Sequence, residues 1–307
     1  MTTPLPAPHV SVVIATRNRP ELLTKAVDAV LSQDYAGTID VTIVYDQTEV
    51  DNARAVGGTT RSVKAIPNAC TPGLPGARNT GIASSTGEII AFCDDDDEWL
   101  PGKLQAQIDE LAKHPQSSFV TTGIRVTYDG EAHDRPSPVT ELTVERLLHD
   151  RTTEAHPSSF LFRRELSDII GPVDEVIPGG YSEDYDFLLR AAKATSVRCV
   201  EAPLVLVRWH QSSFFADRWA TIVDAQRYLL NKHPEFHDHR KAEARLRGQV
   251  AFALAANGRR GEALREVSHV VGRWPLERRW PVALAVASGA VKPGTALKLA
   301  HKVGRGI

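Results

Sequence analysis

The chain has 307 residues, of which 42% are hydrophobic and 24% are charged. These fractions are typical of a globular protein and exclude a largely disordered chain. The length allows one large domain or two smaller ones, and the net charge of −2 argues neither for nor against a nucleic-acid partner.

Strand and helix patterns alternate through the first 114 residues. Apolar runs predict strands, and apolar residues at helical spacing predict helices between them. The strands are predicted at residues 9–16, 39–46, 61–67 and 87–94, and the helices at residues 20–33, 74–85 and 101–114. This alternation predicts a parallel sheet with helices on both faces. Ligands bind beyond the carboxyl ends of such strands, where Thr16, Asp46 and Asp94 lie.

The pattern changes after residue 115. Residues 117–128 predict one or two strands, and residues 158–166 predict a strand that runs into a helix. Residues 182–194 predict a helix with Ser182 as its N-cap. Residues 197–210 predict a long strand region interrupted by Pro203. From about residue 214 the spacing is helical throughout, with helices predicted at residues 218–233, 240–258, 260–274 and 278–289.

Charge is distributed unevenly along the chain. Residues 240–307 contain 14 Lys or Arg and 4 Asp or Glu, whereas the rest of the chain contains 22 and 34. A basic C-terminal tail can contact an anionic membrane surface, and solvated helical faces are the alternative. Trp274 and Trp280 lie in this tail beside arginines, which suits either a membrane interface or packing between helices.

Cysteine use and the absence of targeting patterns predict a cellular compartment. Cys70, Cys93 and Cys199 are widely spaced and form no CxxC pair, which indicates a reducing environment without a disulfide framework. The N-terminus has neither the basic start nor the apolar core of a signal peptide. No uncharged run reaches the roughly 18 residues of a membrane span. We therefore predict a cytoplasmic protein.

Four consecutive aspartates, residues 94–97 in IIAFCDDDDEWLP, follow an apolar strand. Adjacent carboxylates repel one another and raise one another's pKa, which a cation or water relieves. Mg²⁺ and Mn²⁺ prefer oxygen ligands, and Mg²⁺ commonly shares one or two carboxylates with substrate phosphates. The alternative is a solvated acidic turn before a helix. The position at a strand end favours the metal site.

Three segments together resemble an inverting family 2 glycosyltransferase with the GT-A fold. They are VSVVIATRNRPELLTKAVDAVLSQ, GARNTGIASSTGEIIAFCDDDDEWLPGKL and SEDYDFLLRAA, in the family's order and spacing, within about residues 10–210. The resemblance implies a Rossmann-like GT-A catalytic domain over residues 8–215 and a helical C-terminal extension over residues 216–307. It also implies transfer of a sugar, with inversion, from a nucleotide diphosphate donor to an acceptor hydroxyl. A UDP-sugar is the favoured donor.

The resemblance assigns donor binding to residues at matching positions. These residues are Thr16 and Asp46 at the nucleotide base, Arg78 in a loop facing the donor, and Asp94 and Asp95 in the acidic motif. Residues 45–48 read YDQT where the family often reads DDGS. Base recognition therefore rests on fewer matching residues than metal binding does.

The resemblance also assigns the metal and the base. Asp96 matches the direct ligand to Mg²⁺ or Mn²⁺, and His210 matches a polar position near the diphosphate or metal. Asp184 matches the carboxylate that removes the proton of the acceptor hydroxyl. Glu183 and Asp186 are its rivals, but on a helix they point about 100° and 200° away from it. Read without the family, these acids suit the first turn of a helix.

Other polar and aromatic residues support weaker interpretations. Arg17 and Arg19 could reach phosphates, but we interpret them as ordinary surface arginines. His156 suits either an acceptor pocket or a loop. Trp99 is interpreted as a packing residue at a helix start. Trp209 suits either stacking on a sugar or a core position.

Two other functions compete with this one. A nucleotidyltransferase would also hold a metal with carboxylates, but it usually carries a Gly-rich phosphate loop that ATRNRP lacks. A catalytically silent binding module would not need the intact acidic motif and Asp184. The predicted partners are a nucleotide sugar and a glycan or lipid-linked acceptor, with no nucleic acid. A homodimer and peripheral contact of the basic tail with the inner face of the membrane are further options.

Overall fold

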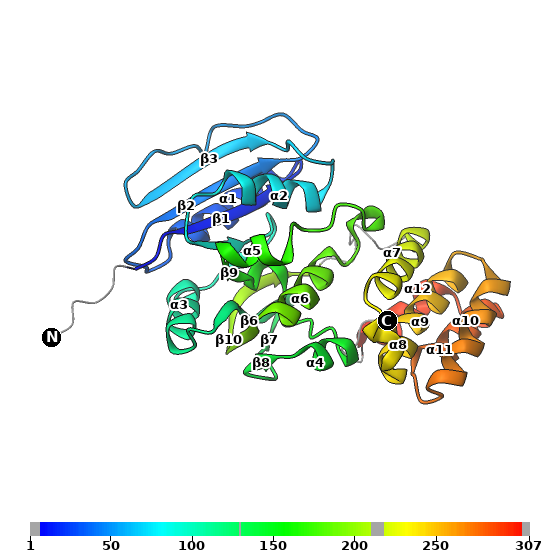
Figure 1. Ribbon diagram of the computed structural model, residues 1–307. Helices are drawn as coiled ribbons and strands as arrows, with labels where there is room; N and C mark the ends of the chain where they lie inside the picture. The colour runs from blue at the N-terminus through cyan, green and yellow to red at the C-terminus, as the bar shows by residue number, and fades with distance from the viewer. Residues whose placement is uncertain (1–6, 129, 210–217, 303–307) are drawn as a thin grey trace. The chain divides into compact units, whose positions relative to one another are not determined.

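The computed structural model describes residues 7–128, 130–209 and 218–302, with side chains described to residue 297 (Figure 1). The chain divides into two compact units. We call the first the sheet unit: Met1–Val144, Thr152–Glu175 and Glu183–His210. We call the second the helical unit: Glu145–Arg151, Val176–Ser182 and Gln211–Ile307.

The sheet unit is built on a mixed sheet with ten strands among the described residues. They are β1 (Val10–Thr16), β2 (Ile39–Tyr45), β3 (Arg61–Pro67), β4 (Ile89–Phe92), β5 (Glu98–Trp99), β6 (Ser117–Tyr128), β7 (Glu131–Arg135), β8 (Glu141–Leu142), β9 (Leu161–Arg163) and β10 (Ser196–Arg208). The order is β3-β2-β1-β4-β9-β6-β10-β5, with β7 paired to β6 and β8 to β10. β1 to β4 are parallel, as predicted, whereas β9 lies antiparallel between β4 and β6.

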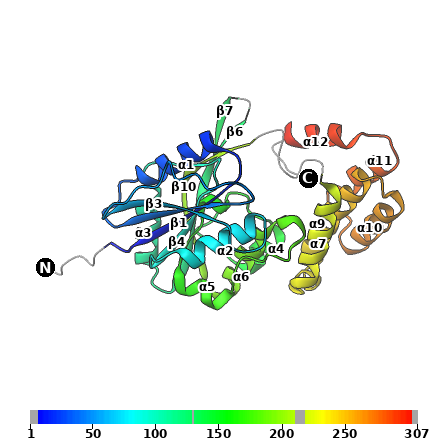
Figure 2. The same ribbon diagram turned by 90° about the horizontal axis from the view of Figure 1, so that it is seen from above.

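Helices cover both faces of this sheet. They are α1 (Pro20–Leu31), α2 (Leu74–Ser84), α3 (Lys103–Lys113), α5 (Arg164–Ile170) and α6 (Glu183–Ala194). Val10, Val12 and Ile14 of β1 belong to the same core cluster as the buried residues of α1 and α3. Gly81 of α2 lies against Val13, and an added Cβ there would come within 2.1 Å of the valine side chain. Since neighbours along a strand face opposite ways, α1 and α2 lie on opposite faces (Figure 2).

A buried aromatic cluster connects the middle of the sheet to α6. Its members are Phe92 of β4, Phe119 of β6, Phe162 of β9, Phe187 of α6, and Phe160. Ring centroids of contacting pairs are 5.0–6.4 Å apart. Such pairs add about 0.5–1.5 kcal/mol each beyond area burial. The cluster therefore fixes the start of α6 near the end of β4.

Pro203 does not break its strand, but it disturbs the pairing. β10 runs through it, with register shifts against β6 between Val200 and Pro203 and again between Pro203 and Val205. Proline has no N–H to donate to the ladder, so a strand tolerates it at an irregularity of this kind. The sequence missed β5 and β8, which have two residues each, and β7, whose residues EAHDR are mostly polar and exposed.

The helical unit packs around one long helix. Its elements are most of α4 (Val144–His149), the 3₁₀ turn η2 (Pro178–Gly180), α7 (Trp219–Lys232), α8 (Glu235–Asp238), α9 (Arg240–Ala256), α10 (Arg260–Arg273), α11 (Arg279–Ala287) and α12 (Pro293–Lys302). The second half of α9 is almost entirely buried and packs against α7, α10 and α11. The predicted helices are confirmed, whereas α4, α8 and α12 were not predicted.

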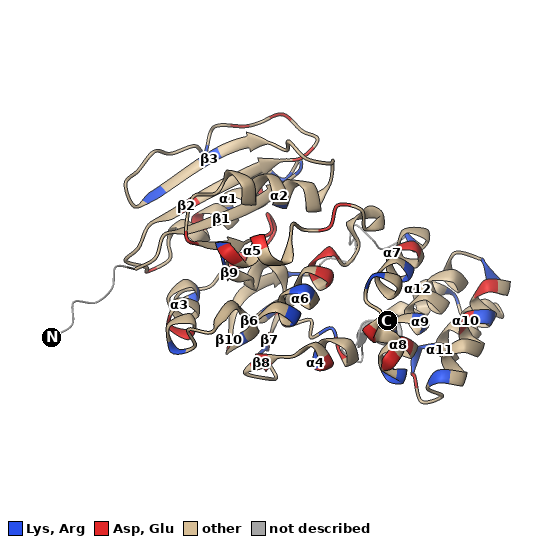
Figure 3. Ribbon diagram, viewed as in Figure 1, with Lys and Arg blue, Asp and Glu red and all other residues tan. Residues whose placement is uncertain are grey.

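Some charges of the helical unit pair with near neighbours. Basic and acidic positions lie side by side on its helices (Figure 3). Arg259 pairs with Glu262 at 2.7 Å and Arg247 with Glu243 at 2.8 Å, each within one helical turn. These pairs agree with the solvated helical face as an account of the basic tail. Within the described residues, every helix is too short or too polar to cross a membrane.

Candidate active site

The carboxyl ends of β1 and β4 meet at the point where the strand order reverses. β2 and β3 follow β1 on one side, and β4 lies on its other side. Open α/β sheets bind ligands at such a switch point. Thr16 ends β1, and its hydroxyl donates to Asp95 Oδ2 in the loop after β4 at 2.7 Å. The structure thus brings together two residues predicted to bind the donor.

Asp46 lies at the same rim, directly after β2, and is held as an acceptor. Its carboxylate accepts hydrogen bonds from the Gln47 and Asn68 amides, both at 2.9 Å, and from the Gly73 N–H at 3.0 Å. Burial raises its pKa, but these three donors outweigh burial and lower the pKa below its usual value. Asp46 is therefore an ionised, rigidly oriented group that can receive an N–H from a ligand.

Gln47 explains how the chain departs from the family's DDGS at this position. Its φ is 52°, in the left-handed region that favours glycine, and the family has glycine here. A non-glycine residue in this conformation costs on the order of 1 kcal/mol. The Gln47 side chain donates to Asp46, and Thr48 donates to Asn18 at 2.8 Å. The turn is thus kept with a side-chain amide added beside Asp46.

Asp95 and Asp96 share one cation. Arg19 Nη1 lies 3.1 Å from Asp95 Oδ1 and 2.6 Å from Asp96 Oδ2. Burial raises the pKa of Asp95 to about 6, despite the hydrogen bond from Thr16. Burial and the nearby Asp94 also raise the pKa of Asp96. Arg19, interpreted from the sequence as an ordinary surface arginine, therefore pairs with the acidic motif, and only its place just after β1 could have indicated this.

Asp97 has different partners and is almost completely buried. Ser158 Oγ donates to Asp97 Oδ2 at 2.5 Å, and His156 Nδ1 lies 3.2 Å from the same oxygen. Burial raises the pKa of Asp97 to about 7, although His156 lowers it. The Trp99 indole donates to the Ser158 carbonyl at 2.9 Å, so Trp99 is the packing residue that was predicted. The sequence offered no signal for Ser158.

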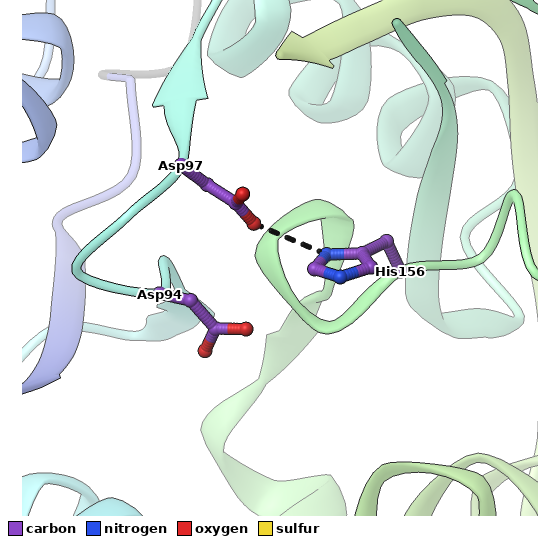
Figure 4. Close-up of side chains that lie close together, drawn as sticks. All are labelled: Asp94, Asp97 and His156. Atoms are coloured by element: carbon purple, nitrogen blue, oxygen red, sulfur yellow. Dashed lines mark ion pairs between the residues drawn. The ribbon is translucent and has the colours of Figure 1, made fainter. Parts of the chain in front are cut away.

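Carboxylate and imidazole atoms gather in one place beside this loop. One ligand atom from each of Asp94, Asp97 and His156 lies within 4.8 Å of the others (Figure 4). Asp96, the predicted metal ligand, is two residues from Asp94. Among the contacts described above, its carboxylate contacts Arg19. Oxygen ligands with one imidazole suit Mn²⁺ and Mg²⁺. A cation would also relieve the raised pKa values of Asp95, Asp96 and Asp97.

Arg78 joins the acidic loop to α6. Its Nη2 donates to Asp94 Oδ1 at 2.7 Å and its Nη1 donates to Glu183 Oε1 at 2.5 Å. Burial disfavours the charge, but Asp94, Glu183 and Asp184 raise the pKa of Arg78 above its ordinary value. The residue predicted to face the donor therefore uses both guanidinium ends within the protein.

The first turn of α6 sorts its three acids. Glu183 is buried against Arg78, and Asp186 is buried against Arg190 Nε at 2.9 Å. Asp184 is only half-buried. Because Asp184 acts electrostatically on Arg78, it belongs to the same rim as Asp94. His210, predicted near the diphosphate or metal, lies outside the described residues.

Comparison with known proteins defines the class. The model of the family described as glycosyl transferase family 2 matches residues 11–170, just over half of the chain. The chain belongs to this family, a class of sugar-transferring enzymes, and the resemblance seen in the sequence is confirmed.

Similar proteins of bacteria cover different parts of the chain. An uncharacterized glycosyltransferase of Nostoc sp. is 31% identical over 54% of this chain and 54% of its own length. The UDP-Glc:alpha-D-GlcNAc-diphosphoundecaprenol beta-1,3-glucosyltransferase of Escherichia coli is 32% identical over 34% of this chain and 42% of its own length. The chain thus spans about half of these relatives. An uncharacterized protein of Mycobacterium tuberculosis is 24% identical over 83% of this chain and 78% of its own length.

Solved structures share the architecture. Staphylococcus aureus TarS 1–349 in complex with UDP-GlcNAc has a TM-score of 0.61 at 15% identity, covering 97% of this chain and 92% of TarS 1–349. The mannosyltransferase PcManGT of Pyrobaculum calidifontis, in complex with GDP-Man and Mn²⁺, has a TM-score of 0.56 at 18% identity, covering 94% and 86%. The predicted GT-A fold with a helical C-terminal region is confirmed.

Proposed function

We propose that this chain is a metal-dependent, inverting glycosyltransferase that moves a sugar from a nucleotide diphosphate donor to an acceptor hydroxyl. The observation that carries the proposal is the meeting of Asp46, the acidic motif and the Arg78–Glu183 pair at the carboxyl ends of β1, β2 and β4. Asp184 follows Glu183 directly, so one rim holds donor-binding groups and a partly exposed base.

The residues divide between binding and proton transfer. Thr16 and Asp46 bind the nucleoside, with the ionised Asp46 accepting an N–H of the base. Asp94 and Asp95 contact the donor diphosphate, and Asp96 would hold the metal. His156 lies near the motif, and His210 keeps its expected role as a second metal ligand. Mg²⁺ or Mn²⁺, when bound, spreads the charge that develops on the departing diphosphate.

Asp184 supplies the base. In an inverting transfer the acceptor oxygen attacks the anomeric carbon from the side opposite the diphosphate, and one carboxylate removes its proton as the bond forms. No covalent enzyme intermediate is required. Asp184 suits this role because it is only half-buried, whereas Glu183 and Asp186 are buried.

A UDP-sugar is the favoured donor. The relative from E. coli is named for UDP-Glc, and TarS was solved with UDP-GlcNAc. PcManGT was solved with GDP-Man, so the base must be tested. The E. coli relative is named for a diphosphoundecaprenol acceptor, which supports a lipid-linked acceptor over a free glycan.

A donor-hydrolysis assay tests the proposal before the acceptor is identified. UDP-Glc, UDP-GlcNAc and GDP-Man are each incubated with the enzyme and Mn²⁺, Mg²⁺ or excess chelator, and nucleoside diphosphate release is measured. Release with one donor that needs the metal supports the proposal. If nucleoside diphosphate is still released in excess chelator, the reaction does not depend on a metal. If the enzyme instead releases pyrophosphate from UTP and a sugar phosphate, it is a nucleotidyltransferase.

Matched variants connect the assay to the acidic motif. Asp96→Asn should lose most of the metal-dependent release, whereas Asp34→Asn, an exposed acid just beyond the far end of α1, should keep it. Nucleotide binding without turnover, in wild type and in every variant alike, would identify a silent binding module.

A further inference from the structure

A chain of alternating charges, buried at Glu183 and Arg78 and partly buried at Asp94, crosses the site. It runs from Glu183 through Arg78 to Asp94 and joins segments that are up to 105 residues apart in sequence. Arg78 is 2% exposed and Glu183 is 5% exposed. Buried charges persist only when they are paired and hydrogen-bonded. This chain of contacts therefore fixes the distance between the loop after β4 and the start of α6.

Each member of this chain is built into a rigid element. Arg78 lies in the first half of α2, and its guanidinium also lies 5.2 Å from the Phe92 ring centroid. Glu183 begins α6, whose Phe187 packs on Phe92. Asp94 is the second residue after β4, and its N–H donates to Ser158 Oγ at 2.9 Å. Displacement of one end is therefore transmitted to the other.

We propose that Arg78 and Glu183 are positioning residues, which hold the base Asp184 at a set distance from the acidic loop. This inference rests on the proposed function. Glu183 precedes Asp184 in the first turn of α6, so the Glu183–Arg78 pair sets where the Asp184 carboxylate lies. Asp94 binds the other end of the same guanidinium. Arg78 therefore sets the positions of both the donor-binding loop and the base.

This assignment changes two roles expected from the sequence. Arg78 was expected to face the donor, but its Nη1 and Nη2 each serve a protein carboxylate. Glu183 was a rival for the base. Its burial and its ion pair with Arg78 suit a structural acid that does not meet the acceptor.

The planar fork of arginine is what makes the bridge possible. Two N–H groups on different nitrogens point to two carboxylates at fixed angles, whereas a lysine ammonium is a single point charge. Arg78→Lys should keep the charge and lose the two-sided geometry. Glu183→Gln should keep the shape and lose the charge at one end.

The central experiment separates turnover from binding. For wild type, Glu183→Gln and Arg78→Lys, hydrolysis of the donor found in the screen is measured together with UDP affinity in the presence of Mn²⁺ by calorimetry. Misplacement of a base by about 1 Å costs up to roughly 100-fold in rate. We expect a loss of about 10- to 100-fold in kcat for both variants, with UDP affinity within about threefold of wild type.

Asp186→Asn is the matched control. Asp186 is a completely buried acid on the same helix with its own arginine, Arg190, but its pair does not reach the acidic loop. A general loss of stability would lower the melting temperature in all three variants. Only the positioning role predicts that kcat per folded molecule falls for Glu183→Gln and stays near wild type for Asp186→Asn.

Two outcomes would overturn the inference. If Arg78→Lys weakens UDP binding tenfold or more while Glu183→Gln is fully active, Arg78 is a donor ligand. If Glu183→Gln abolishes turnover while Asp184→Asn is active, Glu183 is the base.

A test independent of turnover shows whether the bridge itself exists. Urea unfolding of Arg78→Met, Glu183→Gln and the double variant should give a double variant that loses less stability than the two single losses added together. If the stability losses of the two single variants add exactly in the double variant, Arg78 and Glu183 do not interact and the bridge is rejected. Because this cycle needs neither donor nor metal, a wild type without donor hydrolysis would count against the proposed function alone.

Discussion

The sheet unit and the helical unit use charge in different ways. In the sheet unit, Thr16 and Asp95 meet across 79 residues of sequence, and both are buried. In the helical unit, Arg259 and Glu262 form a pair that is partly exposed and only three residues apart. The first pattern requires a folded sheet, whereas the second requires only a helix.

The difference separates a buried cluster of like charges from partly exposed pairs of opposite charge. Burying several like charges works against folding, and the raised pKa values of Asp95, Asp96 and Asp97 record that penalty. A fold keeps such a cluster where a ligand or metal compensates it. Exposed pairs within one helix contribute little in either direction. Changes to the sheet unit should therefore have large effects and changes to the helical surface small ones.

The largest effect is expected at Asp184. Asp184→Asn should lower donor turnover by about 10²–10⁴-fold, because one general base contributes about that much. UDP affinity should change by a few fold at most, since the carboxylate acts mainly in the transition state. Asp168→Asn, an exposed acid on α5, is the control. If the Asp184→Asn enzyme is active, another residue of the rim is the base.

Lys103 tests the cost of a buried charge without touching the site residues. It is completely buried, contacts Gln107 Oε1 at 2.7 Å and lies 3.7 Å from the Trp99 ring centroid. Burial lowers its pKa from 10.5 to about 7, although Cys93 opposes this. Between these values the unfolded chain holds the proton and the folded chain does not. The cost of burying this lysine is thus absent above pH 10.5, where it is neutral in both states, and grows as pH falls toward 7.

The free energy of unfolding should therefore rise with pH in that window by up to about 1.4 kcal/mol per pH unit from this group. Lys103→Met should remove this slope when urea unfolding is compared at pH 7.5 and 9. Lys113→Met, an exposed lysine on the same helix, should retain it. Equal slopes in all three proteins would show that Lys103 keeps its proton in the fold.

Arg19 should have a moderate effect, on metal affinity. Its Nη1 lies between Asp95 and Asp96, so it competes with a cation for these carboxylates. Arg19→Ala should raise the affinity for Mn²⁺ alone by about three- to tenfold, as expected for a pair worth about 1 kcal/mol. Electron paramagnetic resonance of free Mn²⁺ measures this directly. The neighbouring exposed Arg17→Ala should change it less, and weaker Mn²⁺ binding by Arg19→Ala would contradict competition.

The smallest effect is expected on the helical surface. Arg259→Ala removes both hydrogen bonds to Glu262, yet the melting temperature should stay within about 1 °C because exposed pairs contribute little. Arg245, which is 9% exposed and donates to the Leu148 carbonyl, is the internal comparison. Arg245→Ala should lower the melting temperature by several degrees. If both variants lower the melting temperature equally, burial does not decide how much an arginine contributes to stability here.

Local pattern determined much of the fold. The apolar run before Thr16, the helical spacing after Pro20 and the apolar strand before Asp94 predicted β1, α1 and β4 within a few residues. Such elements are predictable because burial of one face forces a period on the sequence. Short edge strands such as β5 and β8, with two residues each, depend on the partner strand and leave no period to detect.

The sequence by itself determined the family, the parallel β1 to β4 core and the rim at which its polar residues gather, because these depend on motifs and periodicities within short segments. Only the tertiary structure decided how the carboxylates are divided. Asp95 and Asp96 face Arg19, Asp97 faces Ser158, and Glu183 reaches Asp94 through Arg78. In sequence the four aspartates are equivalent neighbours, and so are Glu183 and Asp184. Their roles differ because packing buries each one to a different extent and beside a different partner.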